Sequence, residues 1–583
     1  MKEQKLTPTI VWGRYNAGIG FNNNIDLDEE VEANENFFIG KQWEGVKANG
    51  LPTPVFNFLK RVVLFTVASV TSENLKLQAQ PLGNSGAKGE FYKMTSVVNN
   101  EFDSIFEFNK IVNLMREVMR NAAVDGDGCT HTYWDPSIET GQVNKGGIVT
   151  EVIENTRVFF GNPNDRRVQK QPYIIIERRL LTEDLKDRAE KSKVKNWEQI
   201  TPDNSGRREN RSEQNAWSND RTTTLLCYYK NKKTGTVWCY ECTRNVEIRN
   251  IDTGLKLFPI TWLNWDYRQD NYHGQAMVSG LIPNQIFINR AFAMTMISLM
   301  TTAYPKIVYD ATRISRWTNQ VGASIGVKGG DVNNVAKIID PAHVDPQIAQ
   351  FIQLAVNYTE TFLGATPAAL GDVRPDNTSA IIALQRASAT PHELTKQNLY
   401  SNIEDLGRIY VDFMANYYGI REVEITMPKE IPEEIQQFID IKPGEEITGT
   451  FDFNTLKEHP MVMRLDVGAS AYWSEIASMQ TLDNLLMQSK IDLVDYLERI
   501  PDGYISMRQE LLEKLRSQRA EQEAQQGMMP DQNVPVQAPG QGAPQGGSAL
   551  RKGGLLNDGK PIPIPSGPGN GTLQRSLSQG KAV

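Results

Sequence analysis

Few residues of this 583-residue chain combine the types and spacing that metal binding requires. Residues Cys239 and Cys242 form a C-x-x-C pair, and Cys227 lies nearby in the sequence. A zinc site normally has four ligands in two spaced pairs, and here a second pair and a nearby histidine are both missing. The alternative, which we favour, is that these cysteines lie in strands as small apolar residues. We therefore expect no metal site.

Two other patterns could carry chemistry, and both have a plainer interpretation. The sequence Asp-Gly-Asp-Gly at 125–128 begins like a calcium loop, but Pro136 stands where the twelfth-position glutamate is expected. We interpret it as a tight turn between a helix and a strand. The five histidines are scattered singly, and none belongs to an H-E-x-x-H motif.

The motifs of nucleotide hydrolysis and acyl transfer are also absent. No G-x-x-x-x-G-K-[ST] sequence occurs, and no G-x-G-x-x-G follows a strand and opens a helix. A nucleophile-elbow sequence, G-x-S-x-G, is missing as well. We therefore predict no catalytic residue, no cofactor and no enzymatic activity.

The composition is that of a globular chain with a sizeable core. It has 62 Lys and Arg against 70 Asp and Glu, a net charge of −8, and 40% hydrophobic residues. Because a global basic field is absent, any contact with DNA must be local. Four cysteines indicate a reducing compartment, and no signal-peptide pattern opens the chain. The most apolar stretch, 286–304, is too short and too interrupted by polar residues to span a membrane.

Hydrophobic periodicity predicts an α+β chain whose first part is helical. Helices are expected at 26–38, ending near Gly40, at 55–72, and as one continuous helix over 91–124. The second should turn one face inward, formed by Phe58, Val62, Phe65 and Ser69 and widened by Leu59, Val63 and Val70. Between 130 and 260, short β-branched and aromatic runs separated by turns predict a mostly antiparallel β region. Residues 196–221 are polar and are expected to form an exposed, mobile insertion.

The second half is dominated by a long helix expected at 275–303. The second half of that helix is apolar on almost every side, which is typical of a helix surrounded by protein. The elements expected to follow are short strands over 305–345, a helix over 346–363, a loop over 364–375, a helix over 377–418 bent at Pro391, strands over 421–470, and helices over 474–488, 492–499 and 506–525. After Gly527 the chain is rich in proline and glycine and is predicted to be disordered.

The order of these elements, with certain local sequences, resembles the portal protein of tailed double-stranded DNA bacteriophages. The stretches that carry the resemblance are Phe37–Trp43 with its aromatic-Gly-x-Gln-Trp run, Pro54–Asn57, the turn and strand of Asp125–Pro136, Gly161–Pro163, and Tyr272–Arg290. In the Gly161–Pro163 turn, Asn162 stands where portals have aspartate. The resemblance covers roughly residues 35–500 and implies a portal-like fold.

The resemblance implies a division of the chain into named parts. These parts are a wing of N-terminal helices and β region (1–275), a first stem helix (276–303), a clip containing short strands (304–345), a second stem helix (346–363), a tunnel loop (364–377), a helix and strands returning through the wing (378–470), a helical crown (471–526) and the disordered tail (527–583).

The function implied is structural. Portal subunits form a dodecameric ring at one capsid vertex, the conduit for packaging and ejection of double-stranded DNA, which they contact without sequence specificity. The implied partners are the terminase large subunit, the head–tail adaptor, and the major capsid and scaffolding proteins. The protein would be assembled in the host cytoplasm, reside in the virion and not contact membranes. The alternative is another virion structural protein, such as a tail or baseplate component. A packaging enzyme is disfavoured by the missing P-loop.

Three sets of candidate functional residues follow. One chain offers too little surface to cover a helix that is apolar all round, so we expect a subunit interface at Phe287, Phe292, Met296 and Met300. The candidates for weak DNA contacts in the channel are Arg374, Arg386 and Lys396, although Arg374 could instead pair with a neighbouring aspartate. The candidates for partner binding in the clip, which could equally be a solvated loop, are Tyr309, Arg313, Arg316, Trp317 and Lys328.

Overall fold

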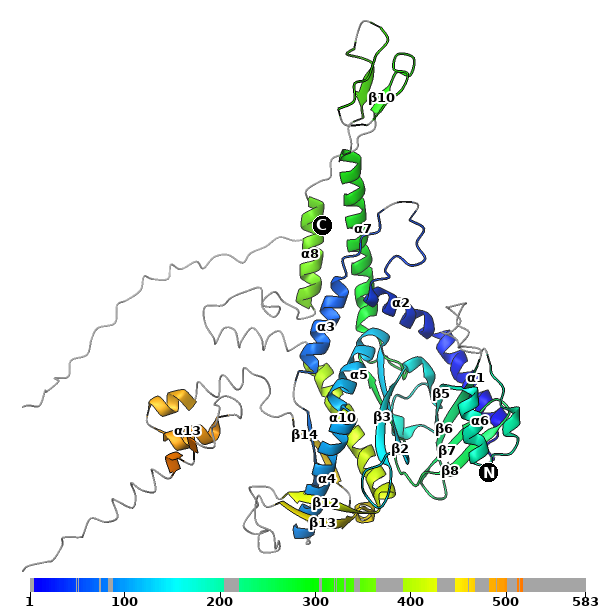
Figure 1. Cartoon of the computed structure of the whole chain (residues 1–583), viewed down its shortest axis with the longest axis vertical. Coiled ribbons are helices and arrows are strands. Elements are labelled where there is room, and N and C mark those ends of the chain that lie inside the picture. Colours follow the sequence, from blue (N-terminus) through cyan, green and yellow to red (C-terminus); the bar gives the residue numbers. More distant parts are fainter. Residues whose placement is uncertain are drawn as a thin grey trace, which may run out of the picture. The chain divides into compact units, whose positions relative to one another are not determined.

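A computed structural model describes residues 5–48, 50, 52–72, 75–81, 88–203, 220–303, 307–318, 320, 322–329, 332–339, 347–362, 392–426, 446–459, 461–466, 482–488, 490–500, 511–512 and 514–516. Residues Met1–Ile491 form one compact unit, and Asp492–Val583 form a second. Figure 1 shows the course of the chain.

Helices form the N-terminal part of the first unit. They are α1 (Pro8–Asn24), α2 (Leu27–Ile39), α3 (Phe58–Val70), α4 (Lys88–Phe108) and α5 (Ile111–Asp125). The prediction of α2 is confirmed, and Gly40 ends it with a φ of 98° that glycine adopts without strain. Helix α1 was not predicted, because its apolar residues are few and spread over several faces.

The prediction of a single helix over 91–124 is wrong, because the structure has two helices there. The chain breaks at Lys110, whose φ of 51° is left-handed, and Asn109 donates hydrogen bonds to the carbonyls of Ile105 and Ile148 at 3.0 Å. The inward face predicted for α3 is confirmed in part, because Leu59, Val62, Val63 and Val70 are buried, together with Thr66 and Val67. Phe58, Phe65 and Ser69, predicted to face inward, lie at its half-buried margin.

The predicted antiparallel β region is confirmed as two sheets. One has the order β4-β5-β6-β7-β8 and the other β3-β2-β9, with every pair antiparallel. The strands are β2 (Asp127–Asp135), β3 (Gly147–Ile153), β4 (Val158–Phe160), β5 (Tyr173–Leu181), β6 (Arg221–Lys230), β7 (Val237–Cys242), β8 (Glu247–Asp252) and β9 (Ile260–Asn264). All four cysteines are free and buried, as the apolar interpretation predicted.

The insertion predicted over 196–221 begins later than expected. Ile200 is buried and Asp203 accepts a 2.7 Å hydrogen bond from Arg179, so residues 196–203 belong to the packed body. The predicted insertion also ends too late, because Arg221 already begins strand β6, and residues 204–219 lie outside the described residues. Helix α6 (Thr182–Lys191) and strand β8 were not predicted, because both are predominantly polar.

The long apolar helix is confirmed as α7 (Met277–Ala303), and it is followed by a hairpin of β10 (Ile307–Tyr309) and β11 (Ala336–Ile338). Helix α8 (Gln347–Phe362) then runs alongside α7 (Figure 1). Their contact consists of Ile288, Ala291 and Ile352, with Phe292 and Val356 beside them. Among the described helices, none combines the length and apolar character needed to cross a bilayer.

Helix α10 (Glu393–Phe413) continues into a π-helical turn, Met414–Tyr418. It packs on β9 and on the strand pair of β1 (Lys76–Pro81) and β14 (Met461–Asp466), while β12 (Ile420–Thr426) pairs with β13 (Glu446–Asp452). Helix α13 (Leu493–Arg499), in the second unit, was predicted. The predictions for residues 364–391, the bend at Pro391 included, and for the disordered tail over 527–583 lie outside the described residues.

Candidate functional site

A buried polar cluster holds the first half of α7 to the N-terminal helices. Gln285 and Asn289, one turn apart on α7, are 0% and 3% exposed. Gln285 donates to the carbonyl of Phe56 at 2.7 Å and to Asn289 Oδ1 at 3.0 Å, and Asn289 donates to Gln42 Oε1 at 2.6 Å. Because buried amides without partners are costly, this chain of bonds specifies one position for α7.

The two segments that meet this cluster are themselves joined. Asn57 caps α3 by accepting the Lys60 N–H at 3.0 Å, and its amide donates to the carbonyl of Phe38 at 2.9 Å. The Trp43 indole N–H donates to the carbonyl of Pro54 at 2.9 Å. The stretches Phe37–Trp43 and Pro54–Asn57, remote from α7 in sequence, therefore meet beside it.

A second buried cluster surrounds Asp127 just before α7 begins. Its Oδ1 accepts from the Gly274 N–H and from Asn264 Nδ2, both at 2.7 Å, and its Oδ2 lies 2.7 Å from His273 Nδ1. The Asp127 and His273 side chains are both 0% exposed. Gly126, with a φ of 96°, has no room for a Cβ, which would lie 3.0 Å from the Gly274 carbonyl. The turn at 125–128 thus fixes the segment that leads into α7.

This aspartate–histidine pair resembles the base and orienting residue of a hydrolase, but it lacks a nucleophile. His273 Nε2 has no hydrogen-bond partner within the described part of the chain. The neighbouring Tyr272 instead ties the cluster to the turn at 161–163, because its N–H donates to the Pro163 carbonyl at 2.9 Å. All the stretches that carried the resemblance therefore contact the first half of α7 or the segment that leads into it.

Helix α7 exposes apolar side chains from Phe287 onward. Phe287 is 42% exposed, Met294 61%, Met296 40% and Met300 54%. Phe292, the fourth residue predicted for a subunit interface, is half-buried and stacks on Phe56 with the ring centroids 4.0 Å apart. Phe292 therefore packs within its own chain, whereas the other three are accessible in the isolated chain.

The segment between α7 and α8 is a hairpin with internal support. The rings of Tyr309 and Trp317 stack at 5.4 Å. Arg313 is tied to the opposite side, where its carbonyl accepts the Lys328 N–H at 2.9 Å and its Nε donates to the Lys328 carbonyl at 3.3 Å. Arg316 and the Lys328 side chain are exposed. The structure brings these five predicted residues together in one hairpin.

The residues predicted to contact DNA are not brought together. Arg374 and Arg386 lie outside the described residues. Lys396 is 8% exposed on the buried side of α10, so its ammonium is poorly placed to reach a phosphate in this conformation. The DNA contact of these three residues stays a prediction.

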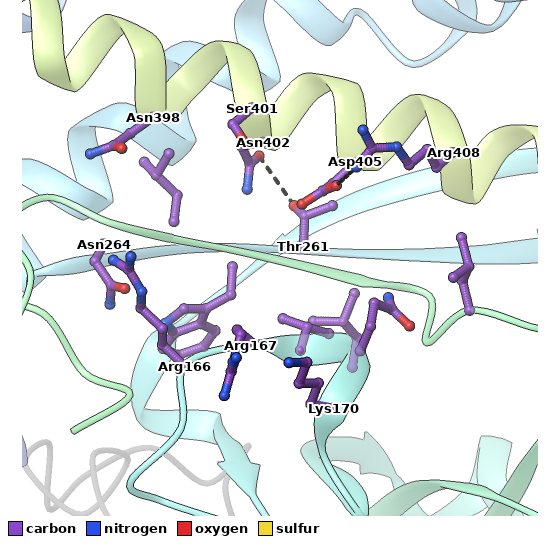
Figure 2. Close-up of a pocket in the computed structure, with 16 residues that line it drawn as sticks. Arg166, Arg167, Lys170, Thr261, Asn264, Asn398, Ser401, Asn402, Asp405 and Arg408 are labelled. Carbon is purple, nitrogen blue, oxygen red and sulfur yellow. Dashed lines mark hydrogen bonds and ion pairs between the residues drawn. The ribbon is translucent and has the colours of Figure 1, made fainter. Parts of the chain in front are cut away.

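Two clefts open beside the sheets, and the sequence alone indicated neither. The first, of about 540 Å³, lies between α10 and residues 166–170, with β9 as its floor (Figure 2). Its basic residues are Arg166, Arg167, Lys170 and Arg408. Three of these four belong to a single short run, which is the signal that the sequence offered.

The second cleft, of about 520 Å³, is built around His131 on β2. His131 Nε2 lies 2.8 Å from the Tyr228 hydroxyl, and Nδ1 lies 3.1 Å from Glu151 Oε1. Burial lowers the pKa of His131 to about 4, although Glu151 opposes this change. Burial also pushes the pKa of Glu151 up, but its bond to His131 and the charge of Arg178 outweigh that effect and leave its pKa below the usual value. The imidazole is therefore neutral at pH 7.

Comparison with known proteins agrees with the architecture around α7. The search of curated proteins finds no match for the chain. The family described as phage P22-like portal protein matches residues 231–550, a segment that contains β7 to β14, α7, α8 and α10. Because this match covers more than half of the sequence, the chain belongs to the phage P22-like portal protein family.

Proposed function

We propose that the chain is the subunit of a dodecameric ring at one capsid vertex, through which double-stranded DNA enters and leaves the virion. In this proposal α7 and α8 are the stem helices, the β10–β11 hairpin is the clip, and the sheets with α1–α6 and α10 form the wing. The terminase large subunit and the head–tail adaptor would dock on the clip, and capsid and scaffolding proteins on the wing. Residues 471–526 would form the crown.

The observation that carries the proposal is the distribution of exposed apolar residues on α7. Phe287 and Met294 are seven residues apart and share one side of the helix, called here face A. Met296 and Met300, one turn apart, form face B. Since Phe287 and Met296 are separated by about 2.5 turns, faces A and B lie on opposite sides of α7. Exposed apolar faces of this kind are typical of interaction sites, where another protein surface covers them.

Two different apolar faces on opposite sides suit a head-to-tail contact between copies. Face A of one subunit would meet face B of the next, and such heterologous contacts close into a ring when the rotation between subunits permits it. An isologous dimer would need only one self-complementary face. The buried cluster at Gln285 and Asn289 supports this assembly, because it holds α7 in one position before the copies meet.

The proposal is tested by blocking one face at a time. The variants are F287K/M294K for face A and M296K/M300K for face B, with V143K as the control, since Val143 is 95% exposed in a turn away from α7. Each double variant should be monomeric, because burying lysine charges opposes assembly, while V143K should assemble normally. Native mass spectrometry and circular dichroism report mass and helix content.

The decisive sample is an equimolar mixture of the two double variants. Each retains one intact face, so the mixture should contain heterodimers and no ring, because the outer faces of the pair are both blocked. Rings formed by either double variant alone would contradict the proposal. So would a mixture that stays monomeric although both variants keep the helix content of the unmodified protein.

A further inference from the structure

We propose that the first cleft, called here the α10 groove, binds phosphate groups, supplied either by a nucleic-acid backbone or by a free nucleotide. The groove lies between α10 and residues 166–170 (Figure 2). The nucleic-acid source rests on the proposed function, whereas phosphate binding itself does not. The groove includes none of the residues predicted to contact DNA.

The charge of the groove contrasts with that of the chain. The chain carries a net charge of −8, yet the groove is lined by four basic side chains and one acidic side chain, Asp405. Arg408 pairs with Asp405 at 2.5 Å, and Arg167 pairs with Asp165 at 2.8 Å behind the lining. Arg166 and Lys170 are both exposed and form no ion pair within the described residues, and the Arg166 guanidinium lies 4.3 Å from the Tyr267 ring centroid. A local basic site on an acidic protein is the electrostatic signature of an anion-binding surface.

A buried hydrogen-bond donor points into the same groove. Asn402 is 4% exposed, and its Oδ1 accepts the Thr261 hydroxyl at 3.2 Å. That bond fixes the orientation of the amide, so that Nδ2 is directed into the groove, as Figure 2 shows. A donor held in a nearly inaccessible position and aimed at a cavity is stabilised when an acceptor occupies that cavity. Phosphate oxygens are such acceptors.

Residues 166–170, which form the basic wall of the groove, are held in place by hydrogen bonds before any ligand binds. Gln169 holds it to the strand region, accepting the Phe258 N–H at 2.9 Å and donating to the Phe258 carbonyl at 3.1 Å. Gln171 closes the other end, because it donates to the Asp165 carbonyl at 2.5 Å and accepts the Asn162 N–H at 2.8 Å. A preformed wall lowers the entropic cost of binding.

The opposite wall adds neutral polar groups at helical spacing. Asn398 and Ser401 are exposed on α10, one turn before Asn402 and Asp405. Phosphate has several acceptor oxygens and can therefore use donors from both walls at once. The volume of about 540 Å³ lies in the range of nucleotide-sized ligands.

The test compares R166Q/K170Q with K232Q/K233Q in the full chain. The control pair removes two exposed lysines from the turn between β6 and β7, outside the groove. Binding of a short fluorescent duplex should weaken by about tenfold in R166Q/K170Q, with the slope of log K against log salt reduced by about 1 to 2. A second variant, N398D, adds a carboxylate at an exposed position and should weaken binding without affecting folding.

Three probes distinguish the sources of the phosphate. If a deoxynucleoside triphosphate competes with the duplex at the groove, the ligand is a free nucleotide; if only the duplex binds, it is a nucleic-acid backbone. Either result should protect Lys170, but not Lys232, from acetylation in the unmodified protein. Polyglutamate that binds as well as the duplex, and loses affinity equally in R166Q/K170Q, would overturn the assignment to phosphate.

Equal affinity of R166Q/K170Q and K232Q/K233Q for every probe, or an unprotected Lys170, would also overturn it. Imaging of R166Q/K170Q separates this inference from the proposed function. If R166Q/K170Q forms normal rings and binds every probe as tightly as K232Q/K233Q, only the assignment of phosphate binding to the α10 groove is contradicted. If the unmodified protein forms no rings, the proposed function is contradicted.

Discussion

Asp127 is the residue on which the entry into α7 depends most. Its carboxylate accepts hydrogen bonds from the Gly274 backbone, Asn264, His273 and Asn155, which come from three different segments. A buried carboxylate with so many donors is stable only while all of them are present. Its importance could be only partly predicted from the sequence, where it reads as an ordinary turn residue.

Replacing Asp127 with asparagine should destabilise the first unit strongly. The asparagine amide presents a second donor where an acceptor is needed, so at least one buried partner loses its bond, at a cost of about 3 kcal/mol. The midpoint of urea unfolding should fall. The control is D165N, since the side chain of Asp165 bonds only locally, to Arg167, and should shift stability by about 0.5 kcal/mol or less. Equal midpoints for the two variants would contradict the role of Asp127.

His131 makes stability depend on pH. Burial lowers its folded-state pKa to about 4 from 6.5, so between these values the unfolded chain binds a proton that the folded chain does not. Stability should therefore decrease as the pH falls from about 6.5 to 4, by about 3 kcal/mol from this residue. The charged and titratable neighbours are Glu151, Arg178, Arg249 and Tyr228.

The H131Q variant should lose this contribution. Its urea midpoint should vary less between pH 7 and pH 4.5 than that of the unmodified protein. The control for loss of a histidine elsewhere in the chain is H459Q, since His459 is half-buried and its ring packs on Phe91 in an edge-to-face arrangement. The same pH dependence in all three proteins would show that folding does not lower the pKa of His131.

At the scale of the elements, the sequence predicted the strands and the apolar helices but not the breaks between helices. The β region, α7 and α8 follow from alternation, turn residues and continuous apolar runs. The break between α4 and α5 could not, because Lys110 is an ordinary helix former and only its tertiary surroundings hold it left-handed. The pairing of β1 with β14 joins residues almost 400 positions apart in the sequence, and no local pattern specifies such a partner.

The element that offers the sharpest prediction is the β10–β11 hairpin. Its fold depends on Ile314, Val335 and the backbone bonds between Arg313 and Lys328, whereas Arg316 and the Lys328 ammonium are exposed. R316E/K328E should therefore preserve rings but weaken binding of the adaptor or the terminase large subunit at least tenfold, measured by pull-down and by titration. Unchanged affinity, with K232E/K233E as the matched control, would count against the hairpin as the docking site.

At the scale of the whole molecule, an acidic chain suits a conduit for DNA. The portal family is a structural class, and like charge keeps the duplex from binding tightly while it moves. The exposed faces A and B of α7 are the largest unexplained feature of the single chain, and they have a simple explanation if copies of the chain surround each other. The candidate site could be predicted as an interface from the apolar helix, but its division into two faces required knowing which side α8 covers.

The measurement that tests this central claim most directly is electron microscopy of the purified, unmodified protein, combined with its native mass. The account predicts closed rings with a central hole and a mass that is one fixed multiple of 65.6 kDa. Monomers at micromolar concentration, or open filaments of the kind expected for a tail component, would contradict it.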